Sequence, residues 1–313
     1  MTDASVNSGP AARPRGWTGA RPGGRLGNGF FVLLLRCGGL RLAPFFICFV
    51  ALWFVATRRA ARTASIAFGR RLGRVRSRGG ALWFAFRHFY TYGLLLVDRL
   101  AMLGGGHDQL RIEYHGEEVL REACRSRRGV VLATAHFGNW AAMGQVVARL
   151  GIPLTVLMYD GEEPGMREQL ARSEGAAAFA VLYTDGGAST AAAVLDLLRA
   201  GQAVGMMGDR VFAGRPVRVP FLGGEVALPA GPYVLAGTSG ALLLQAHLLR
   251  TGPRRYALFA QPIEVLRSGA RQDRQAKLQH GARQFADALA ALVREQPLQW
   301  GNFHDLWAEE APA

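Results

Sequence analysis

His136 is the residue of this sequence that is best placed to act as a base. It follows residues 130–135, an apolar run typical of a buried strand, and it precedes the turn-forming pair Gly138 and Asn139, which we expect to shape the turn and N-cap the next helix. Ligands of open α/β sheets gather at such strand ends, and an imidazole there can accept a proton near neutral pH. We therefore expect general-base chemistry at His136. The alternative is a histidine that only caps a helix or bonds to a backbone carbonyl.

A second polar group follows another strand-like run. Residues 203–207 are apolar, and Gly208, Asp209 and Arg210 come directly after them. A carboxylate beside a guanidinium can orient an imidazole or bind a phosphate, although such a pair can also serve only to hold a loop. Because the carboxyl ends of parallel strands meet at one edge of a sheet, we expect Asp209 and Arg210 to lie near His136.

These strand ends belong to a regular alternation of strands and helices. Such alternation predicts an α/β domain with a largely parallel central sheet flanked by helices. The expected strands are residues 110–114, 130–135, 154–158, 180–183, 203–207 and 256–259, with a further apolar block at 242–249, and the expected helices are residues 117–126, 140–150, 168–173, 189–200 and 275–295.

Three apolar segments complete this domain. Residues 219–225 and 228–232 are rich in turn-forming residues, and we expect them to be loops over an apolar cleft. Residues 300–307 are dense in aromatic side chains. We expect this last segment to pack over the domain as a lid or strap, with substrate contact as the less favoured alternative.

Other kinds of site are not indicated by the sequence. The remaining histidines form no i, i+4 pair and no cluster with cysteines or carboxylates, which argues against a metal site. The glycines at 186–187 lack the spacing of a phosphate loop or a dinucleotide fingerprint, and residues 237–240 lack that of a nucleophile elbow. We therefore expect no metal and no cofactor. The histidines treated as core or surface residues are His88, His107, His115, His247, His280 and His304.

The N-terminal quarter carries the net charge of the chain. Residues 1–78 contain fourteen arginines and one acid, whereas the remainder is nearly neutral, so the formal net charge of +14 is local. Residues 42–56 form an apolar run flanked by arginines, which predicts a membrane anchor. Because this run is shorter than the roughly 20 residues that span a bilayer, a tilted helix, an interfacial helix and a re-entrant segment all remain open.

The arginines that follow the apolar run also indicate a location. Arg58, Arg59 and Arg62 would bind anionic lipids of the inner leaflet, which favours the cytoplasmic face of a bacterial inner membrane. A cleaved signal peptide is disfavoured because the run begins late, and nucleic-acid binding is disfavoured because the arginines are interleaved with apolar residues. We divide the chain into a disordered basic tail (1–25), a membrane-anchoring helical region (26–105), an α/β domain (106–308) and a short tail (309–313).

Taken in order, five blocks of the chain resemble the late acyltransferases of lipid A biosynthesis, the lauroyl and myristoyl transferases of the lysophospholipid acyltransferase superfamily. The likeness covers roughly residues 30–308, and the order of the motifs is specific for the family but not for one substrate. The blocks are residues 135–140, 205–210, 219–223, 228–232 and 300–307.

The resemblance implies transfer of a fatty acyl chain from acyl carrier protein or coenzyme A to a hydroxyl of a membrane glycolipid or lipid-linked acceptor. It implies that His136 is the general base and that Arg210 binds an acceptor phosphate or the developing oxyanion, with help from turn amides near Gly138. It also assigns substrate binding to other motif positions, namely Asn139, Trp140, Phe221, Pro229 and Gly231.

Ala141 departs from the family pattern, in which a carboxylate follows the histidine after four intervening residues. That carboxylate orients the imidazole and stabilises the imidazolium, and the loss of one orienting acid can slow a reaction by about 10⁴-fold. We expect Asp209 to replace it, with Asp160 as the second candidate. If neither does, the chain is a degenerate member of the family that binds lipid or carrier protein without catalysis.

Overall fold

The computed structural model describes residues 24–103, 110–159, 179–184, 187–211, 216–265 and 271–307. Several expectations lie outside these residues: nearly all of the basic tail, the domain boundary near residue 105, Asp160, the helix at 168–173 and the C-terminal tail.

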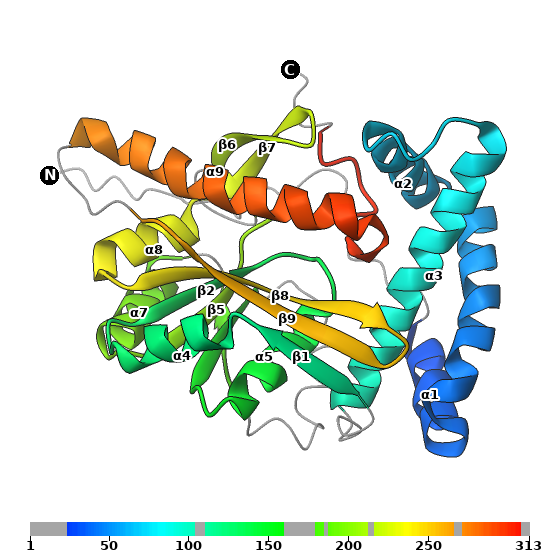
Figure 1. Cartoon of the computed structure of the whole chain (residues 1–313), viewed down its shortest axis with the longest axis horizontal. Helices are drawn as coiled ribbons and strands as arrows, with labels where there is room; N and C mark the ends of the chain where they lie inside the picture. The colour runs from blue at the N-terminus through cyan, green and yellow to red at the C-terminus, as the bar shows by residue number, and fades with distance from the viewer. Residues whose placement is uncertain are drawn as a thin grey trace, which may run out of the picture.

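A seven-stranded sheet forms the centre of the fold (Figure 1). Its strand order is β1-β9-β8-β2-β5-β3-β4, and every neighbouring pair is parallel except β8 and β9. The α/β class and the largely parallel sheet are therefore confirmed. The strands are β1 (Arg111–His115), β2 (Val130–Thr134), β3 (Leu154–Tyr159), β4 (Ala180–Thr184), β5 (Ala203–Met207), β8 (Leu242–Gly252) and β9 (Arg255–Ile263).

Strand β2 lies inside the sheet because it offers apolar side chains to both faces. All five of its residues are buried, and alternate side chains enter different cores, Val131 on one side and Leu132 on the other. Such continuous apolar runs are typical of parallel strands that are covered on both faces.

The register between β2 and β5 positions the candidate site. Thr134 at the end of β2 is paired with Met207 at the end of β5. His136 and Asp209 each lie two residues beyond this pair, so the two neighbouring strands deliver them to the same place at the edge of the sheet.

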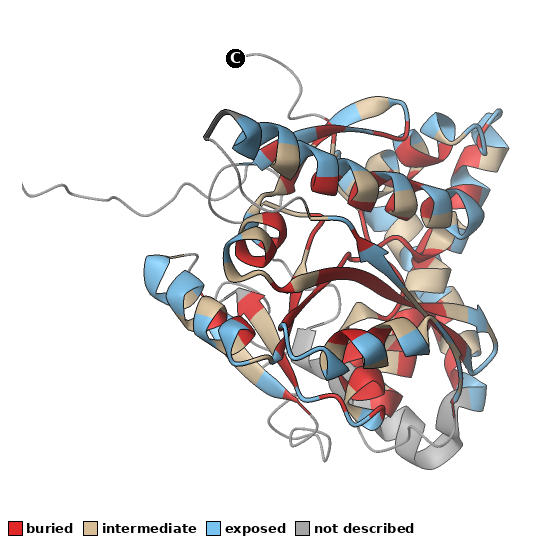
Figure 2. Ribbon diagram, turned by 60° about the vertical axis from the view of Figure 1, so that its left-hand side comes forward, coloured by how far each residue is buried: buried red, intermediate tan, exposed pale blue. Residues whose placement is uncertain are grey.

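Helices cover both faces of the sheet, and Figure 2 shows buried central strands beneath helices with exposed outer sides. One core includes residues of α7, α8 and α9, and the other includes residues of α3, α4 and α5. The helices of the α/β domain are α4 (Glu117–Arg125), α5 (Trp140–Arg149), α7 (Ala188–Arg199), α8 (Gly231–Ser239) and α9 (Arg271–Glu295), followed by the short 3₁₀ helix η3 (Pro297–Gln299).

Residues 216–229 form an antiparallel hairpin, so the expectation of loops at 219–225 and 228–232 is wrong. Strand β6 (Pro216–Phe221) pairs with β7 (Gly224–Pro229), and the connecting Leu222 and Gly223 have φ values of 48° and 80°. Two positive φ values are what a type I′ hairpin turn requires. Prolines are tolerated because a two-stranded ribbon consists only of edge strands. The last residues of the second segment begin α8 instead.

Within the described residues, three helices precede the α/β domain. The first packs along the third (Figure 1), and its buried side chains Ala43, Ile47 and Ala51 recur every four residues, as expected for one helix face. Gly93 admits Ile47, because a Cβ at Gly93 would lie 2.8 Å from that side chain. The helices are α1 (Gly24–Thr57), α2 (Arg59–Arg71) and α3 (Arg78–Leu103).

The opposite face of α1 exposes large apolar side chains. Phe45 is 62% exposed, Phe49 and Trp53 are similarly open, and Trp83 on α3 is 60% exposed. Apolar surface of this kind is typical of a membrane or partner contact. Among the described residues, no single helix is both long and apolar enough to cross a membrane, but Arg41–Thr57 and Arg59–Arg71, which are bent by 97° relative to each other, meet that criterion together. The anchoring role of residues 26–105 stays a prediction.

Candidate active site

A tight turn carries His136 from the end of β2 to helix α5. Gly138 has a φ of +67°, and a Cβ there would lie 2.2 Å from the carbonyl oxygen of Leu248, so only glycine fits. The backbone N–H groups of Gly138 and Asn139 donate to the carbonyls of Gln299 (3.0 Å) and Leu248 (2.7 Å). The turn is thus held by β8 on one side and by the C-terminal segment on the other.

These hydrogen bonds bear on two expectations for the turn. The N–H groups near Gly138 are already paired, so an oxyanion role for them would require those bonds to open. Asn139 stands at the N-cap of α5, but its side chain makes no capping hydrogen bond, which corrects that expectation. The side chain is buried instead, with its amide 3.7 Å from the sulfur of Met102 and hydrogen-bonded to Tyr256. The substrate-binding roles of Gly138 and Asn139 stay predictions.

His136 and Asp209 form a buried, doubly hydrogen-bonded pair. The ring nitrogen Nδ1 of His136 lies 2.9 Å from Oδ1 of Asp209, and the backbone N–H of His136 donates to Oδ2 at 2.8 Å. Because both carboxylate oxygens hold the same residue, they fix the place and the direction of the ring. A carboxylate only accepts, so we assign the proton to Nδ1, which leaves Nε2 as the basic nitrogen.

The charge of this pair is set by its neighbours. Burial alone would raise the pKa of Asp209, but the charge and hydrogen bonds of His136, together with the charge of Arg210, lower it to about 2. Asp209 is therefore ionised at neutral pH. An ionised carboxylate at Nδ1 favours the imidazolium that forms when Nε2 takes up a proton.

The carboxylate of Asp209 contacts His136 from the end of β5. The family pattern instead has such a carboxylate at residue 141. Ala141 itself is half-buried on α5. The expected contact between the first substitute and the histidine is present at 2.9 Å, whereas Asp160 lies outside the described residues. The catalytic roles of His136 and Asp209 stay predictions.

Residues 300–307 cross the site and are called the strap below. Trp300 forms a β-bridge with Phe137. The N–H of Gly301 donates to the carbonyl of His136 at 2.6 Å, and the carbonyl of Gly301 accepts a hydrogen bond from Nη2 of Arg210 at 2.9 Å. The packing expected for this aromatic segment is confirmed. Arg210 helps to hold the strap, and its role toward a phosphate or an oxyanion stays a prediction.

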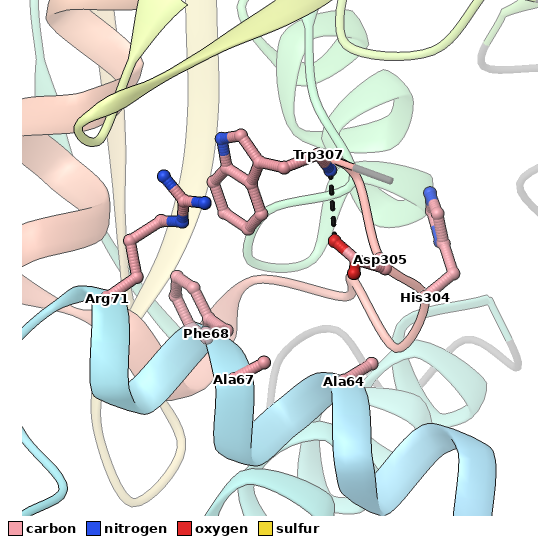
Figure 3. Close-up of a pocket in the computed structure, with 7 residues that line it drawn as sticks. All are labelled: Ala64, Ala67, Phe68, Arg71, His304, Asp305 and Trp307. Atoms are coloured by element: carbon pink, nitrogen blue, oxygen red, sulfur yellow. Dashed lines mark hydrogen bonds between the residues drawn. The ribbon is translucent and has the colours of Figure 1, made fainter. Parts of the chain in front are cut away.

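His304 in the strap is a residue of this site that the sequence reasoning missed. Burial and the charge of Arg210 lower its pKa to about 4, while Asp209 raises it and His136 lowers it. The imidazole is therefore neutral at pH 7. It lines a cavity of about 230 Å³ between α2 and the strap (Figure 3). The one signal for it in the sequence is its position inside an aromatic-rich segment.

An apolar cavity lies beside the candidate base. Its volume is about 40 Å³, and its lining includes Trp140, Met143, Phe179 and Met206. The indole of Trp140 also makes an edge-on contact with the ring of His136, with 5.2 Å between the ring centres. A narrow apolar space suits a hydrocarbon better than a polar group.

Of the seven expected substrate-binding residues, only Trp140 is in the described lining of either cavity, and Phe221, Pro229 and Gly231 also lie away from the turn at His136. Phe221 is buried, and its ring centre lies 5.5 Å from Trp300 and 6.4 Å from Trp307. Pro229 ends β7, and Gly231 begins α8. Phe221 thus supports the strap. It lies on the β6–β7 hairpin and not at the carboxyl ends of the strands of the main sheet, where His136 and Asp209 lie. The substrate-binding roles of these three residues stay predictions.

The chain is similar to known proteins over much of its length. A family model described as bacterial lipid A biosynthesis acyltransferase matches residues 29–309. A phosphatidylinositol mannoside acyltransferase from Mycobacterium tuberculosis is 28% identical over 193 residues, which are 61% of this chain and 58% of that protein. The protein of the same name from Mycolicibacterium smegmatis is 28% identical over 189 residues, or 60% of each chain. The chain spans about three fifths of the length of these curated relatives.

Proposed function

Because the chain belongs to the bacterial lipid A biosynthesis acyltransferase family, we propose that it transfers a fatty acyl chain from an acyl thioester to a hydroxyl of a membrane glycolipid or lipid-linked acceptor. The observation that carries this proposal is the buried pair of His136 and Asp209, in which Nδ1 and Oδ1 lie 2.9 Å apart. Such a pair supplies the base and the orienting acid that acyl transfer to a hydroxyl needs.

In the proposed reaction, Nε2 of His136 takes the proton of the acceptor hydroxyl as its oxygen attacks the carbonyl carbon of the thioester. The carbon–sulfur bond then breaks, the imidazolium returns the proton to the departing thiolate, and an ester and a free thiol remain. Asp209 stays ionised and stabilises the imidazolium. Arg210 is proposed to stabilise the oxyanion or to bind an acceptor phosphate.

The proposed substrates follow from the family and from the apolar cavity. The similar mycobacterial proteins are named for phosphatidylinositol mannoside, and we extend only the class of membrane glycolipid to this chain. The donor is proposed to be acyl carrier protein or coenzyme A that carries the acyl chain. The cavity beside Trp140 suits part of that hydrocarbon chain.

The proposed place of action is the cytoplasmic face of a bacterial inner membrane. The exposed apolar face of α1, with Phe45, Phe49 and Trp53, would enter the lipid. Arg58, Arg59 and Arg62 follow that face and would contact anionic headgroups.

A degenerate family member that only binds lipid or carrier protein is the alternative raised by Ala141. A carboxylate oxygen within about 2.6–3.2 Å of a ring nitrogen of His136 favours the enzyme over this alternative. Asp209 meets that condition at 2.9 Å. This contact supports catalysis without the carboxylate of the usual family pattern.

Lipid mass spectrometry tests the proposal in cells. A strain that lacks the gene is complemented either with the unaltered protein or with His136→Ala, and equal expression is checked by immunoblot. We expect the unaltered protein to restore a lipid that is heavier by one acyl chain, and the variant to leave that lipid absent. Equal rescue by both proteins would rule out the His136 mechanism and favour the binding role.

A further inference from the structure

We infer that the cavity between α2 and the strap binds a phosphate group on a substrate of the proposed reaction, with Arg71 as the phosphate ligand and His304 as the hydrogen-bonding partner of a nearby hydroxyl. The cavity has a volume of about 230 Å³, which is enough for a polar group of several atoms. The identity of the ligand as a substrate rests on the proposed function. The ability of the cavity to bind phosphate does not.

Arg71 is held in a position that suits a phosphate. Its guanidinium carbon Cζ lies 4.2 Å from the centre of the Trp307 ring, so the indole supports one face of the guanidinium. Its planar edge, which matches two phosphate oxygens, is left for a ligand. In the part of the chain that the structure describes, Arg71 has no ion pair with a carboxylate.

The indole of Trp307, which supports the guanidinium of Arg71, is itself held by two hydrogen bonds of Trp307. Nε1 of Trp307 donates to the carbonyl of Phe221 at 3.3 Å, and the backbone N–H of Trp307 donates to Oδ1 of Asp305 at 3.1 Å. Gly224 leaves room for this stack, because a Cβ there would lie 2.6 Å from Trp307 and 2.7 Å from Arg71. A binding group held in place before the ligand arrives loses less conformational entropy on binding.

The other end of the cavity is formed by the strap, which also contacts His136. Figure 3 shows Arg71 and Trp307 on one side and His304 on the other. The strap reaches His136 through Gly301, whose N–H donates to the carbonyl of His136 at 2.6 Å. A ligand with its phosphate at Arg71 would therefore extend toward His136.

The cavity lining carries one cation, Arg71, and one carboxylate, Asp305, so its formal charges cancel and the free hydrogen-bond donors decide what binds. Asp305 is the carboxylate among the described residues that line the cavity, and its Oδ1 already accepts the N–H of Trp307. Arg71 has no carboxylate partner among the described residues, so its guanidinium donors can bind an anion. Two kinds of substrate carry a fitting phosphate ester: a glycolipid acceptor with a phosphodiester head, and a donor with a phosphopantetheine arm.

Isothermal titration calorimetry tests the inference without turnover, because it measures the binding of phosphate-bearing probes to the full chain in detergent. The probes are inorganic phosphate, glycerophosphoinositol for the acceptor and coenzyme A for the donor. The test variant is Arg71→Gln, and Arg70→Gln is the matched control. Arg70 is the exposed neighbour on the same helix, its change removes the same charge, and it does not line the cavity.

We expect at least one probe to bind the unaltered protein and Arg70→Gln alike, and to bind Arg71→Gln about tenfold or more weakly. Weakening for glycerophosphoinositol alone identifies the acceptor as the source of the phosphate, and weakening for coenzyme A alone identifies the donor. Equal binding by the two variants overturns the inference, and so does the absence of binding by the unaltered protein at millimolar concentrations of every probe.

The same titration with His136→Ala separates this inference from the proposed function. We expect that variant to bind the probes normally, because His136 is not in the lining of the cavity. If the probes bind but the unaltered protein transfers no acyl chain, the proposed function fails while the binding result stands.

Discussion

Asp209 reaches His136 from a neighbouring strand rather than from the helix that follows the histidine. The pairing of β2 with β5 makes this possible, because each residue lies two positions beyond the last paired residues of its strand. One carboxylate on Nδ1 is enough to orient the ring, so residue 141 can be small. Ala141 then contributes to the apolar cavity instead.

Asp209→Asn tests the orienting carboxylate. The amide keeps the size of the side chain but cannot stabilise an imidazolium, so we expect kcat to fall by about 10²–10⁴-fold with little change in KM. Steady-state acyl transfer measures this, and circular dichroism checks the fold. Asp196→Asn is the control, because Asp196 is an exposed residue on α7 whose partner is Arg199 at 3.7 Å. An unchanged kcat for Asp209→Asn would remove Asp209 from the mechanism.

The lowered pKa of Asp209 also predicts how stability depends on pH. The pKa of Asp209 is about 2 in the folded chain and 3.8 for an ordinary aspartate, so between these values the unfolded chain binds more protons than the folded chain. The contribution of Asp209 is thus fully present above about pH 4 and is lost as the pH falls toward 2. Urea unfolding from pH 5 downward should show a weaker decline for Asp209→Asn than for Asp196→Asn. Identical declines would show that Asp209 does not hold this low pKa.

At the scale of the element, the turn between β2 and α5 depends on one glycine. Gly138 has a positive φ, and a Cβ added there would lie 2.2 Å from the backbone oxygen of Leu248. Gly223 also has a positive φ, but a Cβ added there would have no atom within 4 Å. A positive φ alone costs about 1 kcal/mol or more, and the clash adds to it. We expect a clearly larger loss in melting temperature and activity for Gly138→Ala than for Gly223→Ala, measured by thermal unfolding and acyl transfer. Equal losses would mean that the packing against β8 is not tight.

The elements that could be predicted from sequence are those with an uninterrupted local pattern. Residues 130–134 and 203–207 are apolar throughout and are strands, and the strong helical period near residues 189–200 is helix α7. The hairpin β6–β7 could not be predicted because its prolines hide an alternating burial pattern. His304 escaped notice because a strap acquires its neighbours only through tertiary packing.

At the scale of the whole molecule, the exposed face of α1 predicts membrane binding. Replacing Phe45, Phe49 and Trp53 together by serine removes apolar groups that contribute about 1 kcal/mol or more each on burial. We expect affinity for vesicles of phosphatidylcholine and phosphatidylglycerol to fall by more than about tenfold in a co-sedimentation assay.

The control for that experiment is Tyr183→Ser, which changes an exposed large side chain on β4, at the far end of the strand order from β1. It should bind vesicles as the unaltered protein does. If the triple variant also binds normally, the apolar face of α1 does not enter the membrane.

The apolar run and its flanking arginines are visible in the sequence, but which face of the helix is buried against α3 is decided by packing.

Acyl transfer by the purified full chain in one turnover tests directly whether His136 is the base of the reaction. A radiolabelled fatty acyl chain is supplied on acyl carrier protein and, separately, on coenzyme A, with extracted membrane glycolipids as acceptors and His136→Ala as the comparison. We expect a labelled ester from the unaltered protein with at least one donor, and a rate lower by about 10³-fold or more for His136→Ala. Transfer by His136→Ala at the unaltered rate would contradict this role of His136.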